Sequence, residues 1–444
     1  MSREMIERAL ERATDTKECI IGENALEAVG DVFKRNFPGA AAAVIIADPR
    51  TWKAAGEKVA SLLAASGIAV KKHILEPDGK LFHGDYAYVP EVKAAIQNAV
   101  PVAVGSGVVN DLTKRAAGEL GTPYMVVGTA ASVDGYSSFG AALRSPEGAK
   151  QTYPCPAPRA IVADLDVMRT APAWMAASGF ADLMAKVPAG ADWILAAELG
   201  AAEWHEAAWH TVQDGLKDAI ADAQGVRRMQ TAPLTRFVEG LMLGGFAMQD
   251  MQSSRPASGA EHMFSHLLEM RNHTYKGAIV PHGIQVGVFT LFMCRMYEQF
   301  LACDYSKMDV EAVLANWKSL EEAERIGREM FALTPFPDIG VKAARAKFID
   351  RDATRARLVD FKTRWPEIKT RLETQLLPAA EIERRLAAVG APTTPEGIGS
   401  TKDATLADAV KTVYMRDRYM LLDFLDLTGQ LAPFARRAVE KLKG

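Results

Sequence analysis

Three histidines and one aspartate are side chains of the types that bind a divalent metal ion. His262 and His266 lie four residues apart, which places them on one face of a helix, and His282 follows in the same region of the chain. Asp182 lies early in an apolar stretch of helical character. One carboxylate and two imidazoles leave coordination positions open, which is typical of a catalytic metal site. For any single histidine, capping or packing is the competing interpretation, and spacing alone does not connect Asp182 to the histidines.

A glycine-rich turn is the first candidate for binding phosphate. The segment VGSGVVND at 104–111 follows an apolar run and opens a helical pattern. Gly105 and Gly107 let the backbone approach a ligand closely, and a helix N-terminus presents N–H groups to an anion. Asn110 occupies the last position of a GxGxxG pattern and no GK[ST] follows, so neither standard nucleotide motif is complete. A purely structural turn is the alternative.

A second polar loop, GTAASVDGYSS at 128–138, also follows an apolar run. Its small and hydroxylated residues, together with Asp134, can donate and accept hydrogen bonds, whereas a turn with an Asx cap is the simpler explanation. Open α/β sheets bind ligands in the crevice at the carboxyl ends of their strands. Two such loops after neighbouring strands therefore favour a ligand-binding crevice.

The elements that position these residues change in type along the chain. Up to about residue 170, short apolar runs alternate with helical patterns, which predicts a parallel α/β sheet. Beyond that point helical patterns dominate, so we expect an α/β domain over 1–170 and an all-α domain over 171–444. Pro366 is expected to break or kink the helical pattern at 355–375. The expected strands are 43–47, 69–75, 100–104, 124–127 and 160–163.

Composition excludes several classes of protein. Of the 444 residues, 49% are hydrophobic and 24% are charged, which is typical of a folded globular protein. A net charge of -3 gives no reason to expect a nucleic-acid partner. Four cysteines without a CxxC pair make neither a disulfide framework nor a zinc knot. No apolar run suits a signal peptide or a membrane span, so we expect a cytoplasmic protein.

Taken together, these groups of residues resemble the sn-glycerol-1-phosphate dehydrogenase family. That family is a branch of the superfamily that holds iron-containing alcohol dehydrogenases, glycerol dehydrogenases and dehydroquinate synthases. The resemblance extends from about residue 20 to 430. Its matching segments are VGSGVVNDLTK at 104–114, TAASVDGYSSFGAAL at 129–143, SGFADLMAK at 178–186, SSRPASGAEHMFSH at 253–266, HGIQVG at 282–287 and GAPTTPEGIGSTKD at 390–403.

The resemblance implies an N-terminal dinucleotide-binding domain, a helical C-terminal domain and one divalent metal, which is zinc, nickel or iron. The metal ligands that it implies are Asp182, His262 and His282. His266 is then a further polar group of the site and Asp134 lies near the substrate, and we expect both to be catalytic. The residues implied in binding NAD or NADP are Gly105, Ser106, Gly107 and Asp111 at the pyrophosphate, and Thr129 and Ser132 at the nicotinamide half.

Three departures from the family pattern bear on substrate and rate. HGEQ is usual in the family where this chain has His282-Gly-Ile284-Gln, so a glutamate near the metal is lost. Proline usually precedes Thr-Ala-Ala-Ser, and this chain has Gly128 there. Pro188 interrupts the helical pattern after Asp182, where we expect a kink.

The expected activity is a metal-dependent, NAD(P)-linked interconversion of sn-glycerol 1-phosphate and dihydroxyacetone phosphate, with a place in phospholipid metabolism. The metal acts as a Lewis acid on a substrate hydroxyl, and a hydride passes between that carbon and the nicotinamide. The alternatives are a glycerol or other polyol dehydrogenase, a lyase of the dehydroquinate synthase type, and a binding module without metal. We expect a homo-oligomer, a dimer or larger.

Specificity rests on a few charged side chains. Asp48 follows the strand expected at 43–47, where a carboxylate accepts hydrogen bonds from the adenosine ribose and repels a 2′-phosphate. Arg50 softens that rejection, so we expect NADH to be preferred and NADPH tolerated. A phosphorylated substrate needs cationic or N–H partners, which free glycerol does not. Arg255, Lys150 and Lys186 are the candidates, and a structural salt bridge is the alternative for Arg255.

Overall fold

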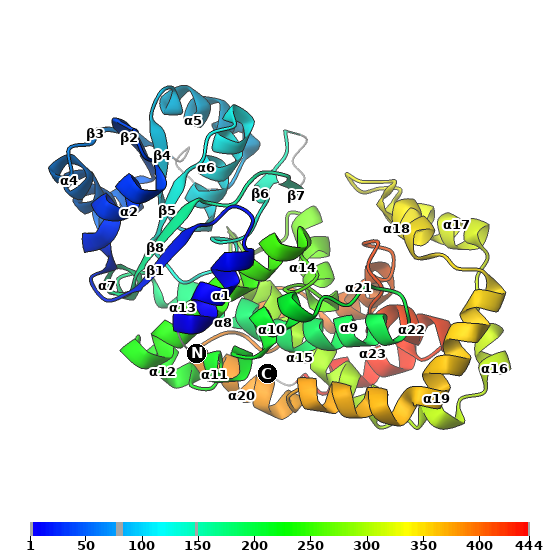
Figure 1. The fold of residues 1–444 in the computed structure, drawn as a ribbon. Helices are drawn as coiled ribbons and strands as arrows, with labels where there is room; N and C mark the ends of the chain where they lie inside the picture. Colours follow the sequence, from blue (N-terminus) through cyan, green and yellow to red (C-terminus); the bar gives the residue numbers. More distant parts are fainter. Residues whose placement is uncertain (1–2, 77–82, 147–149, 443–444) are drawn as a thin grey trace. The chain divides into compact units, whose positions relative to one another are not determined.

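Figure 1 shows the computed structural model, which describes residues 3–76, 83–146 and 150–442. The chain folds as two compact units, and each unit is assembled from separate segments. The first comprises Met1–Leu183, Ala207–Ser254 and Ala388–Gly390, and the second comprises Met184–Glu206, Arg255–Ala387 and Ala391–Gly444. The boundary expected near residue 170 marks the place where secondary structure changes from mixed to helical. The two units are defined differently, by which segments contact one another in space. The division into domains 1–170 and 171–444 therefore stays a prediction.

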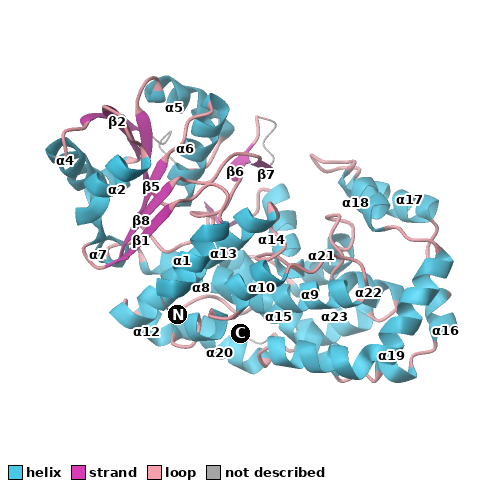
Figure 2. Ribbon diagram, in the orientation of Figure 1, coloured by secondary structure: helices cyan, strands magenta, loops and turns pink. Residues whose placement is uncertain are grey.

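A six-stranded parallel sheet organises the first unit (Figure 2). The predicted α/β class is confirmed, and all five expected strands are present. The sixth strand, β1, is not predicted from the sequence, because its apolar run covers only residues 19–21. In spatial order the strands are β1 (Glu18–Gly22), β8 (Ala160–Asp164), β5 (Met125–Gly128), β4 (Val100–Gly105), β2 (Ala42–Ala47) and β3 (Ala69–Ile74).

Helices cover both faces of this sheet (Figure 1). On one face, α2 (Val29–Asn36) and α4 (Glu57–Ala65) bury Phe33 and Leu63 against the apolar side chains of the strands. On the other face lie α5 (Val89–Ile96) and α6 (Gly107–Leu120). Because both faces are covered, the central strands are continuous apolar runs rather than alternating ones, which is why they stand out in the sequence.

The order of the strands reverses between β2 and β4. The chain passes from β2 outward to β3 and then returns to the other side of β2 to form β4. In open α/β sheets the ligand crevice lies at such a reversal, outside the carboxyl ends of the two strands. Asp48 follows β2 and Gly105 ends β4, so these two of the predicted coenzyme-binding residues lie at the reversal.

A hairpin and several helices complete the first unit. The hairpin consists of β6 (Ala141–Arg144) and β7 (Lys150–Tyr153), and it packs beside α6. The long helix α13 (Thr231–Met251) contacts β1, which explains why residues 207–254 belong with the sheet. The remaining helices are α1 (Arg3–Arg12), α3 (Pro49–Thr51), α7 (Leu165–Arg169), α8 (Ala173–Met184), α10 (Glu206–Gln213), α11 (Leu216–Ala219) and α12 (Ala223–Arg227).

The second unit is helical apart from a short antiparallel pair, β9 (Thr274–Tyr275) and β10 (Ala278–Ile279). Candidate site residues lie on α14 (Ala260–Met270) and α15 (His282–Leu301), which pack against each other and against α9 (Lys186–Glu198). The other helices are α16 (Val310–Leu314), α17 (Leu320–Phe331), α18 (Ile339–Lys347), α19 (Arg351–Gln375), α20 (Ala379–Val389), α21 (Lys402–Thr412), α22 (Leu421–Leu427) and α23 (Leu431–Glu440).

Two prolines have different effects on their helices. Pro188 lies in the first turn of α9, and the helix is interrupted at Ala185, so the interruption expected after Asp182 is confirmed. At Pro366 a break does not occur, because α19 runs without interruption from Arg351 to Gln375. Its buried face carries Phe361, Trp365, Ile368 and Leu372, and this packing outweighs the missing N–H of the proline.

The sequence predicts neither a disulfide framework nor a membrane-spanning helix. Cys19, Cys155, Cys294 and Cys303 are all free thiols. Within the described ranges, none of the helices combines the length and the apolar character that crossing a membrane requires.

Candidate active site

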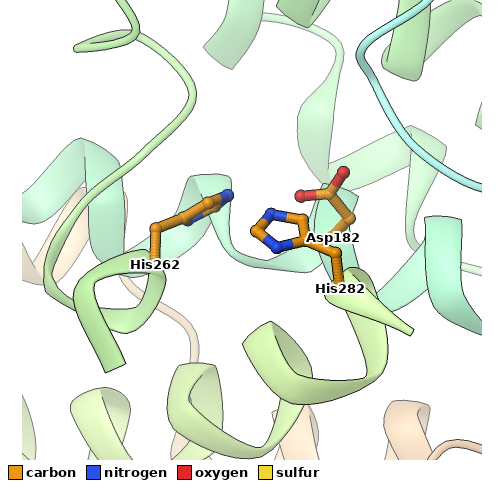
Figure 3. A group of neighbouring side chains, drawn as sticks. All are labelled: Asp182, His262 and His282. Atoms are coloured by element: carbon orange, nitrogen blue, oxygen red, sulfur yellow. The ribbon is translucent and has the colours of Figure 1, made fainter. Parts of the chain in front are cut away.

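The predicted metal ligands come together in space. Asp182 near the end of α8, His262 in α14 and His282 at the start of α15 each offer one ligand atom, and these atoms all lie within 4.8 Å of one another. Figure 3 shows the carboxylate and the two imidazole rings turned toward a common point. Asp182 and His262 are buried and His282 is half-buried. One carboxylate oxygen and two imidazole nitrogens suit a divalent transition metal and leave room for further ligands.

Each of the two ligand histidines has a carboxylate at its other ring nitrogen. His262 Nδ1 lies 2.8 Å from Oε1 of Glu261, and His282 Nδ1 lies 2.9 Å from Oε1 of Glu269. A proton on Nδ1 satisfies such a carboxylate, which leaves Nε2 of each ring as the metal ligand. Glu261 is fully buried and also accepts the N–H of Gly259 at 2.7 Å. The donor set therefore fits a metal ion both in its ligands and in the groups that orient them.

His266 lies one helical turn after His262 and is not part of the ligand group. Its Nδ1 lies 3.1 Å from Oε2 of Glu269, and its ring stacks on that of His282 with the centroids 5.8 Å apart. Burial lowers the pKa of His266 to about 3, and the charge of Arg416 acts in the same direction. His266 is therefore a neutral imidazole beside the predicted metal ligands, and Glu269 orients two histidine rings at once.

Asp182 is also tied to the second polar loop. The backbone N–H of Asp134 donates to Oδ2 of Asp182 at 3.2 Å. α8 approaches this loop so closely that a Cβ at Gly179 would overlap the carbonyl of Ala131. On the other side, the hydroxyl of Ser137 donates to the main chain of α13 at 2.9 Å. Two helices thus fix the loop and place Asp134 beside Asp182, a predicted metal ligand.

The glycine-rich turn joins β4 to α6. Gly105 is the last residue of β4, and a Cβ there would overlap the side chain of Val109. The first intrahelical hydrogen bond runs from Asn110 N–H to the carbonyl of Ser106 at 3.0 Å, so the N–H groups of the first turn point out of the helix end. The Asn110 side chain accepts a hydrogen bond from the hydroxyl of Tyr124 at 3.0 Å, which explains why a third glycine is absent from that position.

The two polar loops are neighbours at the carboxyl ends of β4 and β5. Gly105 pairs with Gly128, and the N–H of Thr129 donates to the carbonyl of Gly105 at 3.1 Å. Thr129 and Ser132 are both buried. This arrangement confirms that the loops follow adjacent strands, as the sequence predicts.

Asp111 connects α6 to the β6–β7 hairpin. Its Oδ2 accepts the N–H of Ala142 at 3.2 Å, and its Oδ1 lies 3.4 Å from Nζ of Lys114. Lys114 is itself fully buried and donates to the carbonyls of Gly135 and Gly140 at 2.9 and 3.0 Å. These contacts give Asp111 a structural role, and its contact with the coenzyme pyrophosphate stays a prediction.

Asp48 is the N-cap of α3. Its Oδ1 accepts the N–H groups of Arg50 and Thr51 at 2.7 and 3.0 Å, and the Thr51 hydroxyl accepts the Asp48 N–H at 3.0 Å. This reciprocal capping fixes the carboxylate at the carboxyl end of β2. Since Oδ1 serves the cap, the predicted contact with the ribose involves Oδ2.

The three candidates for binding phosphate differ in their surroundings. Arg255 donates to the carbonyl of Tyr419 at 3.1 Å, and burial lowers the pKa of its guanidinium. Lys186 is fully buried in α9. Lys150 begins β7, but its side chain lies outside the described part of the chain.

The carboxylates that orient the histidines, Glu261 and Glu269, are not among the site residues predicted from the sequence. The family's usual glutamate at position 284 is replaced by Ile284, and the departure predicts a loss of carboxylate near the metal. Glu261 and Glu269 supply that chemistry from α14 instead. The available signal is their spacing, because Glu261 directly precedes His262 and Glu269 follows His266 by three residues, on the same face of the helix.

A family model described as iron-containing alcohol dehydrogenase matches residues 20–172. Among solved structures, glycerol dehydrogenase from Schizosaccharomyces pombe is 17% identical, with a TM-score of 0.59 over 97% of this chain and 92% of its own. A probable glycerol dehydrogenase from Sinorhizobium meliloti 1021 is 16% identical, with a TM-score of 0.59 over 95% and 98%. At such identities the likeness establishes the fold alone.

Relatives more similar in sequence are named glycerol-1-phosphate dehydrogenase (NAD(P)+). The Bacillus velezensis protein is 31% identical over 73% of this chain and 84% of its own length. The Halalkalibacterium halodurans protein is 34% identical over 63% of this chain and 70% of its own length. The Pyrococcus horikoshii protein is 32% identical over 63% of this chain and 78% of its own length. From this identity over most of the relatives' length, the chain belongs to the glycerol-1-phosphate dehydrogenase family, within the superfamily of iron-containing alcohol dehydrogenases.

Proposed function

We propose that this oxidoreductase interconverts sn-glycerol 1-phosphate and dihydroxyacetone phosphate, with NAD or NADP as the hydride carrier. The observation that carries the proposal is the convergence of Asp182, His262 and His282, whose ligand atoms lie within 4.8 Å of one another. Relatives that carry this activity in their names support the choice of substrate. The strand reversal between β2 and β4 supports the binding of a dinucleotide.

The ligand set suits zinc, nickel or iron, and a divalent metal held there supplies a Lewis acid that makes a substrate hydroxyl more acidic. Asp182, His262 and His282 are its ligands in this proposal. Glu261 and Glu269 accept the Nδ1 protons of the two rings, which fixes the ring orientations and makes Nε2 more basic.

Asp134 and His266 are the residues that we assign to the reacting hydroxyl group. The Asp134 backbone is hydrogen-bonded to Asp182, so its side chain begins next to a metal ligand. His266 is a neutral imidazole at physiological pH because its pKa is lowered to about 3. With Nδ1–H directed at Glu269, Nε2 of His266 can accept a hydrogen bond and orient the substrate.

The coenzyme binds along the carboxyl edge of the sheet in this proposal. Gly105, Ser106 and Gly107 receive the pyrophosphate at the N-terminus of α6, where backbone N–H groups and the helix dipole favour an anion. Asp111 closes this part of the site. Thr129 and Ser132 contact the nicotinamide half, and Asp48 contacts the adenosine ribose.

The phosphate group of the substrate requires positive partners. Arg255 and Lys150 are the side chains that we assign to it, because a guanidinium fork and an ammonium group both bind phosphate oxygens. A free polyol makes no use of such partners, so they distinguish the proposed substrate from glycerol.

The deciding experiment is a substrate panel on metal-loaded protein with NADH and with NADPH. We expect dihydroxyacetone phosphate to be reduced much faster than dihydroxyacetone, with NADH preferred and NADPH tolerated. Equal use of the unphosphorylated compound would replace the proposal with a glycerol dehydrogenase. Turnover without net change in NAD(P)H would indicate a lyase.

Three further expectations accompany this function. A role in phospholipid metabolism is consistent with the substrate class, since glycerol phosphates are precursors of the glycerol phosphate backbone of phospholipids. A cytoplasmic location and a homo-oligomer, dimeric or larger, are part of the same proposal. Cell fractionation and sedimentation measure these last two directly.

A further inference from the structure

A pocket of about 150 Å³ lies within the second unit. Its walls come from α17, α18, α19 and α22, which lie at the right of Figure 1. The segment before α17 and the segment between α21 and α22 complete it. None of the predicted metal, coenzyme or substrate residues lines this pocket, so the proposed function gives it no role.

Most of the residues that line the pocket are apolar, and four of them are aromatic: Trp317, Phe348, Tyr414 and Tyr419. The ring centroids of Trp317 and Phe348 are 6.0 Å apart. Nε1 of Trp317 donates to the carbonyl of Ile349 at 3.2 Å, which fixes the indole in the wall. An apolar cavity of about 150 Å³ is large enough for one benzene-sized ring. The pocket therefore suits a small ligand with an apolar body, and not a dinucleotide.

Five charged residues also line the pocket, three of them cationic and two anionic. Asp423 lies 2.5 Å from Nζ of Lys347, and Asp426 lies 2.7 Å from Nζ of Lys318. Each carboxylate thus has its own ammonium group. The third cation is Arg357, and no carboxylate of the described residues forms an ion pair with it. The charges in the wall therefore leave one positive charge over, which complements a ligand with a single negative charge.

Arg357 is half-buried on α19. Its Nη2 donates to the carbonyl of Gly200 at 3.0 Å, and its other donors have no partner in the part of the chain that the structure describes. Burial lowers the pKa of this guanidinium, and a neighbouring anion would offset the lost hydration. The hydroxyl groups of Tyr414 and Tyr419 likewise have no hydrogen-bond partner among the described residues, so they are further donors available to an anion.

We propose that this pocket binds a small carboxylic acid in its ionised form, with a single ring or a branched apolar body of similar size. The carboxylate lies on Arg357, because the fork of a guanidinium matches two carboxylate oxygens. The apolar body packs against Trp317 and Phe348. A mostly apolar wall with a few polar groups that fix the orientation is typical of small-molecule sites.

The first test uses benzoate and benzamide as probes, because they share a ring and differ in charge. Calorimetric titration of the metal-loaded protein should show saturable binding of benzoate and at least tenfold weaker binding of benzamide. Arg357→Gln keeps an N–H donor and loses the charge, so it should raise the Kd for benzoate about 10- to 100-fold and change that for benzamide by less than about 3-fold. Arg325→Ala, on the exposed side of α17, is the control and should leave both values unchanged.

The second test fills the pocket without changing its charges. Ala323 lines the pocket and is half-buried, so Ala323→Leu places a larger side chain in the ligand's space and should abolish the binding of both probes. The Tm of each variant shows that it is folded. Benzoate that binds elsewhere, for example at the metal, would keep its affinity in Arg357→Gln and in Ala323→Leu, and that result would overturn the proposal. Equal affinities for benzoate and benzamide, or no saturable binding of benzoate by the unmodified protein, would overturn it as well.

Discussion

The carboxyl edge of the sheet and the helices that carry the histidines recognise charge by different means. At the sheet edge, the glycine-rich turn offers backbone N–H groups at the start of α6, and its glycines serve close packing, as with Gly105 against Val109. On α14 and α15, recognition depends on side chains, and each ligand imidazole has a carboxylate at its Nδ1. The sheet edge is therefore tolerant of sequence, whereas the histidine helices are not.

This difference determines what each region loses on substitution. A backbone site keeps most of its donors when one side chain changes, because the N–H groups belong to the fold. A site built from three side-chain ligands loses one of its three protein ligands when one residue changes. Substitutions at the histidine helices should therefore have larger effects than substitutions at the sheet edge.

The largest effect is expected for Asp182→Asn. Removing the negative ligand while keeping the shape should release most of the metal and lower kcat/KM by about 1000-fold or more, which corresponds to about 4 kcal/mol. Metal content is measured by elemental analysis and activity by NAD(P)H absorbance. Chelation of the unmodified protein should have the same effect, and added zinc or nickel should reverse it. Asp214→Asn, an exposed carboxylate paired with His210, is the control. Full activity in the demetallated protein would contradict the metal assignment.

A smaller loss is expected for Glu269→Gln. Glu269 accepts from both His266 and His282, and glutamine offers one oxygen where two are used. Changing a group that orients a metal ligand lowers metal affinity about 10- to 100-fold. Titration of the metal-free protein with zinc measures this affinity, and Glu329→Gln on the exposed side of α17 is the matched control. An unchanged affinity would mean that the Glu269 carboxylate does not orient His282.

The same difference explains what can be predicted from the sequence. The buried strands β2, β4, β5 and β8 are predictable because apolar runs carry a strong signal, and Asp182, His262 and His282 are predictable because they are rare residue types. β1 is not, since it pairs with β8, which is distant in the chain, and the short hairpin strands β6 and β7 carry no comparable apolar run. Glu261 and Glu269 are ordinary helix residues by type, and only the packing of α14 against α15 shows what they hold.

Packing can also override a local preference that the sequence shows. Pro366 is a helix breaker by its chemistry, but the buried aromatic face of α19 keeps the helix continuous. Asp111 matches the family pattern for the coenzyme site, and the sequence does not show that its carboxylate also accepts from Ala142 and lies near Lys114. A single sequence shows the residue type at each of these positions and not the partner that it meets.

Buried charge in the second unit should also make stability depend on pH. Burial raises the pKa of Asp192 to about 7 in the folded protein, above its value in the unfolded chain. The folded state therefore keeps this proton longer, and the stabilisation it brings is complete at low pH and lost as the pH rises through about 7. Asp192→Asn removes the ionisation, so its stability relative to the unmodified protein should increase from pH 5 to pH 8, on the order of 2 kcal/mol. Thermal unfolding of the metal-loaded proteins across this range measures the difference, and a difference that does not change with pH would contradict the prediction.

The smallest effect is expected at the sheet edge, for Asp48→Asn. Asparagine is as good an N-cap as aspartate, so the contacts to Arg50 and Thr51 survive while the negative charge is lost. Without that charge the 2′-phosphate of NADPH is no longer repelled, and the ratio of kcat/KM for NADPH to that for NADH should rise about tenfold, or about 1.4 kcal/mol. Asp48→Ala separates the two roles of this residue, because it removes both charge and cap and should cost about 1 kcal/mol of stability as well. If the coenzyme ratio stays constant in Asp48→Asn, Oδ2 does not face the ribose, and the backbone of the glycine-rich turn would then bind the coenzyme without a carboxylate to choose between its two forms.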